Sequence, residues 1–164
     1  MNLAEAKEIK KDNFVKIYDS PITFSIGRCL EDVAINESGI SGQFFVYSRQ
    51  PDGTLKESEI HIDKSDQWNL ISPICLTVNI LRIFHFYAQD EDNKCLEKND
   101  ENIRYFMKAE NEEKTKWTFM VEERNNVNFT CHHISYLHSF QNVINAHLNY
   151  NYSDENFIRY LLNN

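Results

Sequence analysis

Residues 42–62 read GQFFVYSRQPDGTLKESEIHI, and this stretch decides the class of fold. Two segments with apolar positions, 42–48 and 55–62, flank the sequence Arg-Gln-Pro-Asp-Gly-Thr. Proline presets the backbone of a turn, aspartate tolerates its second position, and glycine adopts the left-handed conformation that closes it. The pattern predicts a β-hairpin, and with it an antiparallel sheet.

Towards the C-terminus the chain again has the pattern of strands. Three segments are candidates because of their alternation or their branched and aromatic residues: 103–108, 117–121 and 127–134. In the second of them, Trp117, Phe119 and Val121 would share one face. Asn125-Asn126 is expected to form the tight turn that leads into the third.

Helices are expected on both sides of these strands. Five segments are predicted from helix-forming composition or from apolar residues at steps of three and four: 3–17, 22–35, 74–87, 135–148 and 153–162. Ser72-Pro73 is the expected N-cap and first position of the third helix. Ser135 and Ser153 would cap the last two. Residues 74–87 also alternate, so a long central strand is the alternative for them.

The order of the expected elements favours one fold class. Hairpin-linked strands with helices gathered in blocks predict an α+β fold, with an antiparallel sheet packed against helices, and not a doubly wound sheet. A chain of 164 residues fits a single domain, 1–164. Within it, the polar and charged residues 88–101 are expected to form a loop.

Composition excludes several kinds of protein. The chain is 41% hydrophobic and carries a net charge of −8, so it can bury a core and repels nucleic acid and anionic membranes. The N-terminus lacks the apolar segment of a secretion signal, and asparagine and charged residues interrupt the longest apolar run, 70–87. The four cysteines, at 29, 75, 95 and 131, are widely spaced and are expected to be reduced. We predict a cytoplasmic protein.

The segment 128–138, NFTCHHISYLH, gathers one cysteine and three histidines. A zinc site usually has two close pairs of ligands, and only Cys131 and His133 form such a pair, so neither a metal nor another cofactor is expected. Alternation along a strand would place these two on the face of Phe129, with His132 on the opposite face and His138 in the first turn of the next helix. Cys131 is expected to be a small core residue and not a nucleophile.

Familiar catalytic motifs are missing from the sequence. It contains no G-x-S-x-G, Walker A or G-x-G-x-x-G pattern, and its four glycines offer little for a phosphate-binding loop. Two carboxylate pairs, Glu57/Glu59 and Glu122/Glu123, have polar neighbours and are expected to be solvated. The sequence therefore predicts a protein that is not an enzyme.

Two classes of function fit these observations. The first is a small, acidic, intracellular binding protein of the immunity or antitoxin kind, which neutralises a toxin, such as a basic nuclease, by covering its active site. The expected contact residues are acidic: Asp90, Glu91, Asp92, Glu122 and Glu123. The alternative is a small-molecule-binding α+β domain or small enzyme, with a pocket lined by aromatic residues and histidines between sheet and helices. A toxin reading frame beside this gene would favour the first class.

Overall fold

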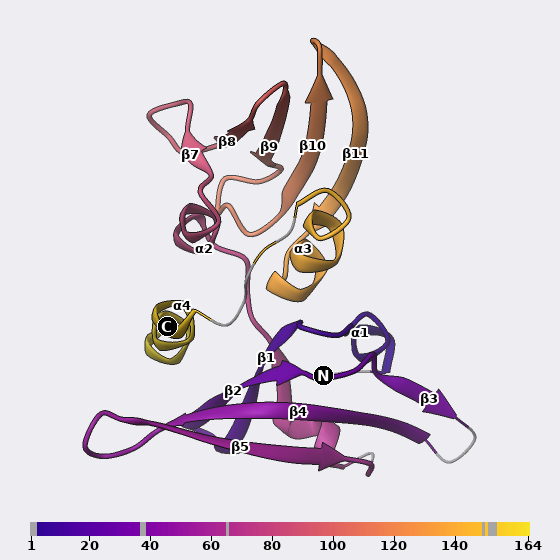
Figure 1. Cartoon of the computed structure of the whole chain (residues 1–164), viewed down its shortest axis with the longest axis vertical. Helices are drawn as coiled ribbons and strands as arrows, with labels where there is room; N and C mark the ends of the chain where they lie inside the picture. The colour runs from indigo at the N-terminus through magenta and orange to yellow at the C-terminus, as the bar shows by residue number, and fades with distance from the viewer. Residues whose placement is uncertain (1–2, 37–38, 65, 149, 151–153) are drawn as a thin grey trace. The chain divides into compact units, whose positions relative to one another are not determined.

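The computed structural model describes residues 3–36, 39–64, 66–148, 150 and 154–164. The chain divides into two compact units (Figure 1). Unit 1 consists of residues 1–74 and 137–164, and unit 2 of residues 75–136. Strands dominate both units, and a few short helices accompany them, so the broad α+β expectation is confirmed.

Unit 1 is built on a six-stranded sheet in which every pairing is antiparallel. Its strands are β1 (Phe14–Ser20), β2 (Thr23–Cys29), β3 (Ala34–Asn36), β4 (Gly39–Arg49), β5 (Leu55–Ile62) and β6 (Ile71–Pro73). Along the sheet the order is β3-β4-β2-β1-β6, and β5 also pairs with β4. The long β4 therefore connects the hairpin to the rest of the unit.

The β4–β5 hairpin confirms the prediction made for residues 42–62. Eight residue pairs join the strands, from Gly42↔Ile62 to Arg49↔Leu55. Asp52 Oδ1 accepts hydrogen bonds from the backbone N–H of Thr54 (2.9 Å) and from its hydroxyl (2.6 Å). Gly53 has φ +84°, a conformation that glycine adopts without steric cost. The turn residues thus act as their types predict.

The helices expected over 3–17 and 22–35 are wrong. The first is helical only in α1 (Leu3–Ala6), and the remainder of both segments contains β1 and β2. The step of four between Ile22 and Ile26 has no helical meaning, because Ile22 is 92% exposed at the β1–β2 turn and Ile26 is buried in the sheet. Strands covered on both faces lose the strict alternation that distinguishes them from helices.

Both faces of the sheet in unit 1 carry buried residues. On one face, Val15, Phe44 and Val46 belong to a core cluster that also contains Trp68. Trp68 lies in a short 3-10 helix, Gln67–Leu70. On the other face, Phe14 meets Phe157 edge-on, with ring centroids 5.4 Å apart. The chain is therefore packed against each side of the sheet.

Two helices of the C-terminal segment provide the cover on that second face. They are α3 (Leu137–Ile144) and α4 (Glu155–Asn163). The buried Gln141 in α3 accepts a hydrogen bond from the Phe14 N–H (3.0 Å) and donates one to the Asp12 carbonyl (3.0 Å). Asp154 caps α4, whereas the expected cap Ser153 lies outside the described residues. Helix α3 begins two residues after Ser135.

Unit 2 is an antiparallel meander of five strands in chain order. They are β7 (Tyr87–Ala88), β8 (Cys95–Asp100), β9 (Ile103–Ala109), β10 (Trp117–Glu123) and β11 (Asn126–Ile134). Figure 1 labels them from β7 to β11 in one continuous series. The strands predicted over 103–108, 117–121 and 127–134 are thus confirmed, and Trp117, Phe119 and Val121 are all buried.

The helix expected over 74–87 is shorter than predicted. Helix α2 runs only over Val78–Ile83, and its N-cap is Thr77, whose hydroxyl accepts a hydrogen bond from the Ile80 N–H (3.3 Å). Ser72-Pro73 belongs to β6 and caps no helix. After α2 the backbone of His85 is left-handed, at φ +64°. The Phe86 N–H then donates a hydrogen bond to the Leu81 carbonyl, so the helix ends in a Schellman motif.

The polar loop expected over 88–101 is also shorter than predicted. Ala88 belongs to β7, and residues 95–100 form β8, which pairs with β9 along its whole length. Polar residues form a strand here because the β8 backbone gains a neighbour on each side and only Leu96 points into the core. The loop is limited to residues 89–94. Among the described residues, no helix combines the length and the apolar character that crossing a membrane requires.

Candidate functional site

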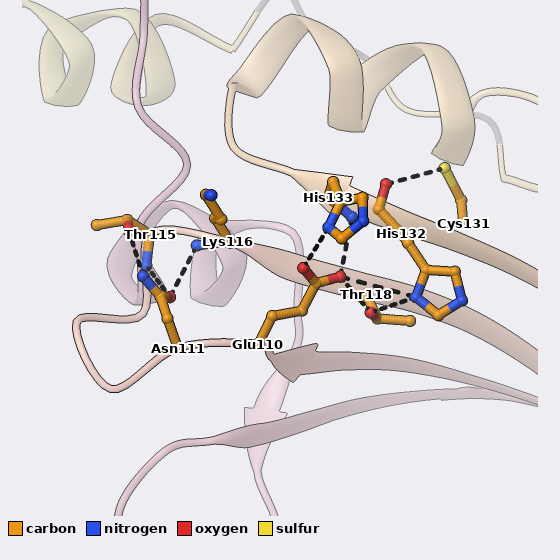
Figure 2. Close-up of polar contacts among 8 residues, drawn as sticks. All are labelled: Glu110, Asn111, Thr115, Lys116, Thr118, Cys131, His132 and His133. Atoms are coloured by element: carbon orange, nitrogen blue, oxygen red, sulfur yellow. Dashed lines mark hydrogen bonds and ion pairs between the residues drawn. The ribbon is translucent and has the colours of Figure 1, made fainter.

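Two of the three histidines in the segment 128–138, His132 and His133, lie beside a carboxylate that does not stand out in the sequence. Glu110 begins the β9–β10 loop, residues 110–116 (Figure 2). The Asn111 side chain shapes this loop, since its Oδ1 accepts hydrogen bonds from the N–H groups of Thr115 (3.0 Å) and Lys116 (3.1 Å). Glu110 N–H in turn bonds the Lys116 carbonyl at 2.8 Å. The loop therefore holds Glu110 next to the end of β11.

A β-bulge in β11 brings both histidines to the same carboxylate. Trp117 pairs with Ile134 and Phe119 pairs with Cys131, so His132 and His133 together face the single residue Thr118. His133 has φ +62°. The predicted alternation, with His132 on the face opposite to His133, is wrong because the inserted residue breaks the two-residue period.

The contacts at Glu110 are short and directed. Its Oε1 accepts hydrogen bonds from the Thr118 hydroxyl (2.6 Å) and from the His133 N–H (2.9 Å). Its Oε2 lies 2.6 Å from His133 Nδ1. Figure 2 shows Thr118, His132 and His133 converging on this side chain. These hydrogen bonds, that of Thr118 first, lower the pKa of Glu110 from 4.5 to about 2. The carboxylate is therefore ionised at neutral pH.

An ionised carboxylate fixes the tautomers around it. Because Glu110 only accepts, His133 Nδ1 donates and keeps its proton. The Thr118 hydroxyl donates its hydrogen bond to Glu110, so its oxygen accepts one from His132 Nδ1 at 3.0 Å. Both imidazoles then carry the proton on Nδ1 and offer Nε2 as acceptor when neutral. Their side chains are 62% and 81% exposed.

A histidine oriented by a carboxylate resembles part of a catalytic triad, which also requires a nucleophile beside the imidazole. Cys131 does not match this role: burial raises the pKa of its thiol, and its Sγ contacts the carbonyl of His132 at 4.0 Å. Cys131 is also only half-buried, and Phe129 is 38% exposed, so the expected core face is a partly open one. The Thr118 hydroxyl is buried and occupied by Glu110. In the described part of the chain, no three His, Cys, Asp or Glu side chains are arranged to hold a metal ion.

The five acidic residues selected from the sequence fall at two different ends of the sheet in unit 2. Asp90, Glu91 and Asp92 lie in the β7–β8 loop, residues 89–94. Glu122 and Glu123 end β10 beside the β10–β11 turn. Because successive turns of a meander alternate between ends, a strand length of roughly 20 Å separates the two groups. They do not form one contact surface.

The first group has a second loop beside it. Lys94 Nζ lies 2.8 Å from Glu112 Oε2, and Lys114 donates a hydrogen bond to the Asp92 carbonyl. Asp90 has a structural part, since its carboxylate accepts the N–H groups of Lys94 (2.8 Å) and Cys95 (3.1 Å). We call the two loops together, residues 89–94 and 110–116, the acidic end of unit 2.

The carboxylates of the second group, Glu122 and Glu123, are bonded to neighbouring side chains. Glu122 forms an ion pair with Arg104, and its side chain is only 15% exposed. Glu123 accepts a hydrogen bond from Asn128 Nδ2 at 3.3 Å. The turn beside them consists of Arg124 and Asn125, both at positive φ, and not of the predicted Asn125-Asn126. This end is less available to a partner.

A pocket between sheet and helix, the feature of the alternative function, lies in unit 1. Aromatic residues of β4 line it together with α4, whereas no histidine does. Neither this pocket nor Glu110 could be selected from the sequence, because both depend on residues brought together from separate strands. The one available signal was the position of Glu110 between two predicted strands. Comparison with known proteins finds no matching family model, no matching curated protein and no matching solved structure.

Proposed function

We propose that this protein is a non-enzymatic, intracellular binding protein of the immunity or antitoxin kind. Its acidic end of unit 2 would cover the active site of a basic toxin, such as a nuclease. The observation that carries the proposal is the joining of two acidic loops, 89–94 and 110–116, into one surface. These loops hold six acidic and three basic residues, so their net charge is −3.

The acidic end is held in place before any partner arrives. Two lysines, Lys94 and Lys114, cross between the loops, and the side chains of Asp90 and Asn111 bind the backbone of their own loops. A surface that is already ordered loses less conformational entropy when it binds. This supports a role in recognition more than a role as a flexible, solvated edge.

The remaining carboxylates of the acidic end face solvent. Glu91, Asp92 and Glu113 are exposed, so their field reaches an approaching partner. Negative charge of this kind accelerates association with a positively charged active site and disfavours nucleic acid as a competing ligand. Occlusion requires no chemistry from the protein.

The proposal is tested with the product of the neighbouring reading frame, purified and co-expressed with this chain. We expect a complex and the rescue of growth from that product. Glu91→Lys/Asp92→Lys should slow association, most strongly at low salt, because exposed charges are screened beyond about 8–10 Å at physiological ionic strength. Asp90 is kept, since its substitution would disturb the loop.

The matched control is Asp100→Lys/Glu101→Lys, which makes the same charge change at the other end of the same sheet. It should leave the association rate nearly unchanged. If the two double variants slow association equally, general charge attraction explains the effect and the acidic end is not the contact surface. If no complex forms with the unmodified chain, the immunity proposal itself fails.

A further inference from the structure

Unit 1 contains a cavity of about 590 Å³ between its sheet and α4. The volume is within the roughly 300–1,000 Å³ typical of small-molecule sites. The floor comes from three neighbouring strands and the wall from the helix. The lining residues that matter here are Arg28, Phe45, Tyr47, Glu57, Ile158 and Arg159.

Strand register explains why these floor residues share one face. Arg28 of β2 pairs directly with Phe45 of β4, and Tyr47 pairs with Glu57 of β5. Since Phe45 and Tyr47 are two residues apart, all four side chains project on the same side of the sheet. A cation, two aromatic rings and a carboxylate therefore follow one another across three strands.

Arg28 is the unusual member of this set. Its Nε is buried and has no hydrogen-bond partner in the part of the chain that the structure describes. Its guanidinium carbon lies 5.9 Å from the centroid of the Phe45 ring. A buried donor without an acceptor is costly, and more so on a charged group. Guanidinium groups are suited to binding a planar carboxylate through two parallel hydrogen bonds.

The other arginine of the cavity is already occupied. Arg159 donates to Glu155 Oε1 from both Nε (2.8 Å) and Nη2 (2.6 Å), and to the Gly53 carbonyl from Nη1 (3.1 Å). It links α4 to the hairpin turn and lines the cavity at that side. Of the two described arginines that line the cavity, Arg28 is therefore the one with an unpaired donor.

We infer that this cavity binds a small organic acid, whose carboxylate Arg28 holds and whose flat or apolar body lies against Phe45 and Tyr47. Glu57 and Glu155 line the same cavity, so a polyanion such as a nucleoside triphosphate would be repelled. The site lies in unit 1 and is independent of the acidic end of unit 2. The outcome of a binding test at this cavity therefore does not decide the proposed function.

The experiment follows backbone amide resonances of the full chain during titration with sodium benzoate, a planar carboxylate with an aromatic body. We expect saturable shifts confined to β2, β4, β5 and α4, with a Kd of about 1 mM or below. Benzamide, the neutral isostere, should bind about tenfold more weakly or worse, because it lacks the charge that Arg28 would pair. Inorganic phosphate, titrated separately, should produce smaller shifts than benzoate.

Two variants and one control locate the site. Arg28→Gln should weaken benzoate binding about tenfold or more, and Leu55→Trp should block it by filling the cavity. The control Lys56→Gln removes the same charge from the adjacent position of β5, where side chains point to the opposite face, and should bind like the parent.

Three results would overturn the inference. The first is an absence of shifts at the cavity with benzoate in the unmodified chain, which requires no variant to fold. The second is equal benzoate affinity for Arg28→Gln and Lys56→Gln. The third is tighter binding of phosphate than of benzoate at the same resonances, which would exclude a carboxylate as the preferred ligand.

Discussion

Glu110 connects three separate pieces of the chain: the β9–β10 loop, the buried hydroxyl of Thr118 and the bulge at His133. A charged acceptor with these partners contributes more to the stability of the fold than a neutral one would. Hydrogen bonds to charged groups stabilise by about 1.5–3 kcal/mol each in mutational series. The local shape of β11 therefore depends on one side chain that lies outside the strand.

Replacing this carboxylate should make unit 2 less stable in a pH-dependent way. In the folded protein the pKa of Glu110 is about 2, below its ordinary 4.5, so the stabilisation is present above about pH 4.5 and is lost as the pH falls towards 2. We expect Glu110→Gln to lower the urea midpoint at pH 6, and the difference from the parent to shrink at pH 3. A difference that is constant with pH would show that the ionised form has no special role.

His138 lies in the first turn of α3, as the sequence predicts. It is 0% exposed, and burial lowers the pKa of its imidazole, although the carboxylates of Glu8 and Glu5 oppose the shift. Substituting a buried side chain of this size is expected to destabilise the fold. His138→Gln should destabilise unit 1 by about 1–3 kcal/mol, whereas His61→Gln on the exposed side of β5 should cost almost nothing.

The lowered pKa of His138 also predicts acid sensitivity. Below about pH 6.5 the unfolded chain takes up a proton that the folded chain resists, so stability falls as the pH falls below that value, until the folded imidazole also protonates. Denaturation midpoints of the parent should drop between pH 7.5 and 5.5. His138→Leu should show a flatter dependence, and an equally steep one would assign the effect to another group.

At the scale of elements, the antiparallel pairing of β1 with β2 in unit 1 places the Ile17 side chain against Gly27. A Cβ atom placed there would lie 2.5 Å from Ile17 Cδ1, well inside van der Waals contact. Gly27→Ala should therefore destabilise by about 1–3 kcal/mol through overpacking. Ile17→Val removes the clashing atom, so the double variant should recover part of the loss in a thermal unfolding measurement. A double variant whose losses simply add would show that the contact is not the cause.

At the scale of the whole molecule, unit 2 is a continuous insertion, residues 75–136, between the two parts of unit 1. The ends of the insertion pair with each other, because Cys75 forms an isolated bridge with Tyr136. The flanking residues of unit 1 are also adjacent, since Leu137 N–H bonds the Ile74 carbonyl at 2.8 Å. Unit 2 thus begins and ends at neighbouring points, and the two parts of unit 1 are also adjacent where unit 2 is inserted.

This arrangement predicts that unit 1 tolerates removal of unit 2. A chain in which a short Gly-Ser linker replaces residues 75–136 should still unfold cooperatively, because its termini at 74 and 137 need to span only one hydrogen-bonded pair. Circular dichroism and thermal unfolding would check this. Loss of cooperative unfolding would instead support the single domain over 1–164 that the sequence predicts.

Local chemistry determined what the sequence alone could predict. The turn at Pro51-Asp52-Gly53 and the strand with Trp117, Phe119 and Val121 depend on residues close together in the chain, and both are found as predicted. The last helix likewise buries Phe157, Ile158 and Leu161. In each case the preference of a residue and its neighbours agrees with the final environment.

Tertiary structure decided the rest. Residues 14–29 form strands of a sheet that is covered on both faces in unit 1. Such strands lack the alternation of apolar and polar residues by which a strand is recognised in a sequence. The pairing of His132 and His133 with Glu110 follows from a bulge, and a one-residue insertion leaves no mark on composition or spacing. Arg28 lines a cavity with Phe45 and Ile158 only because β2, β4 and α4 meet. Contacts between distant segments are set by packing, and packing is a property of the whole fold.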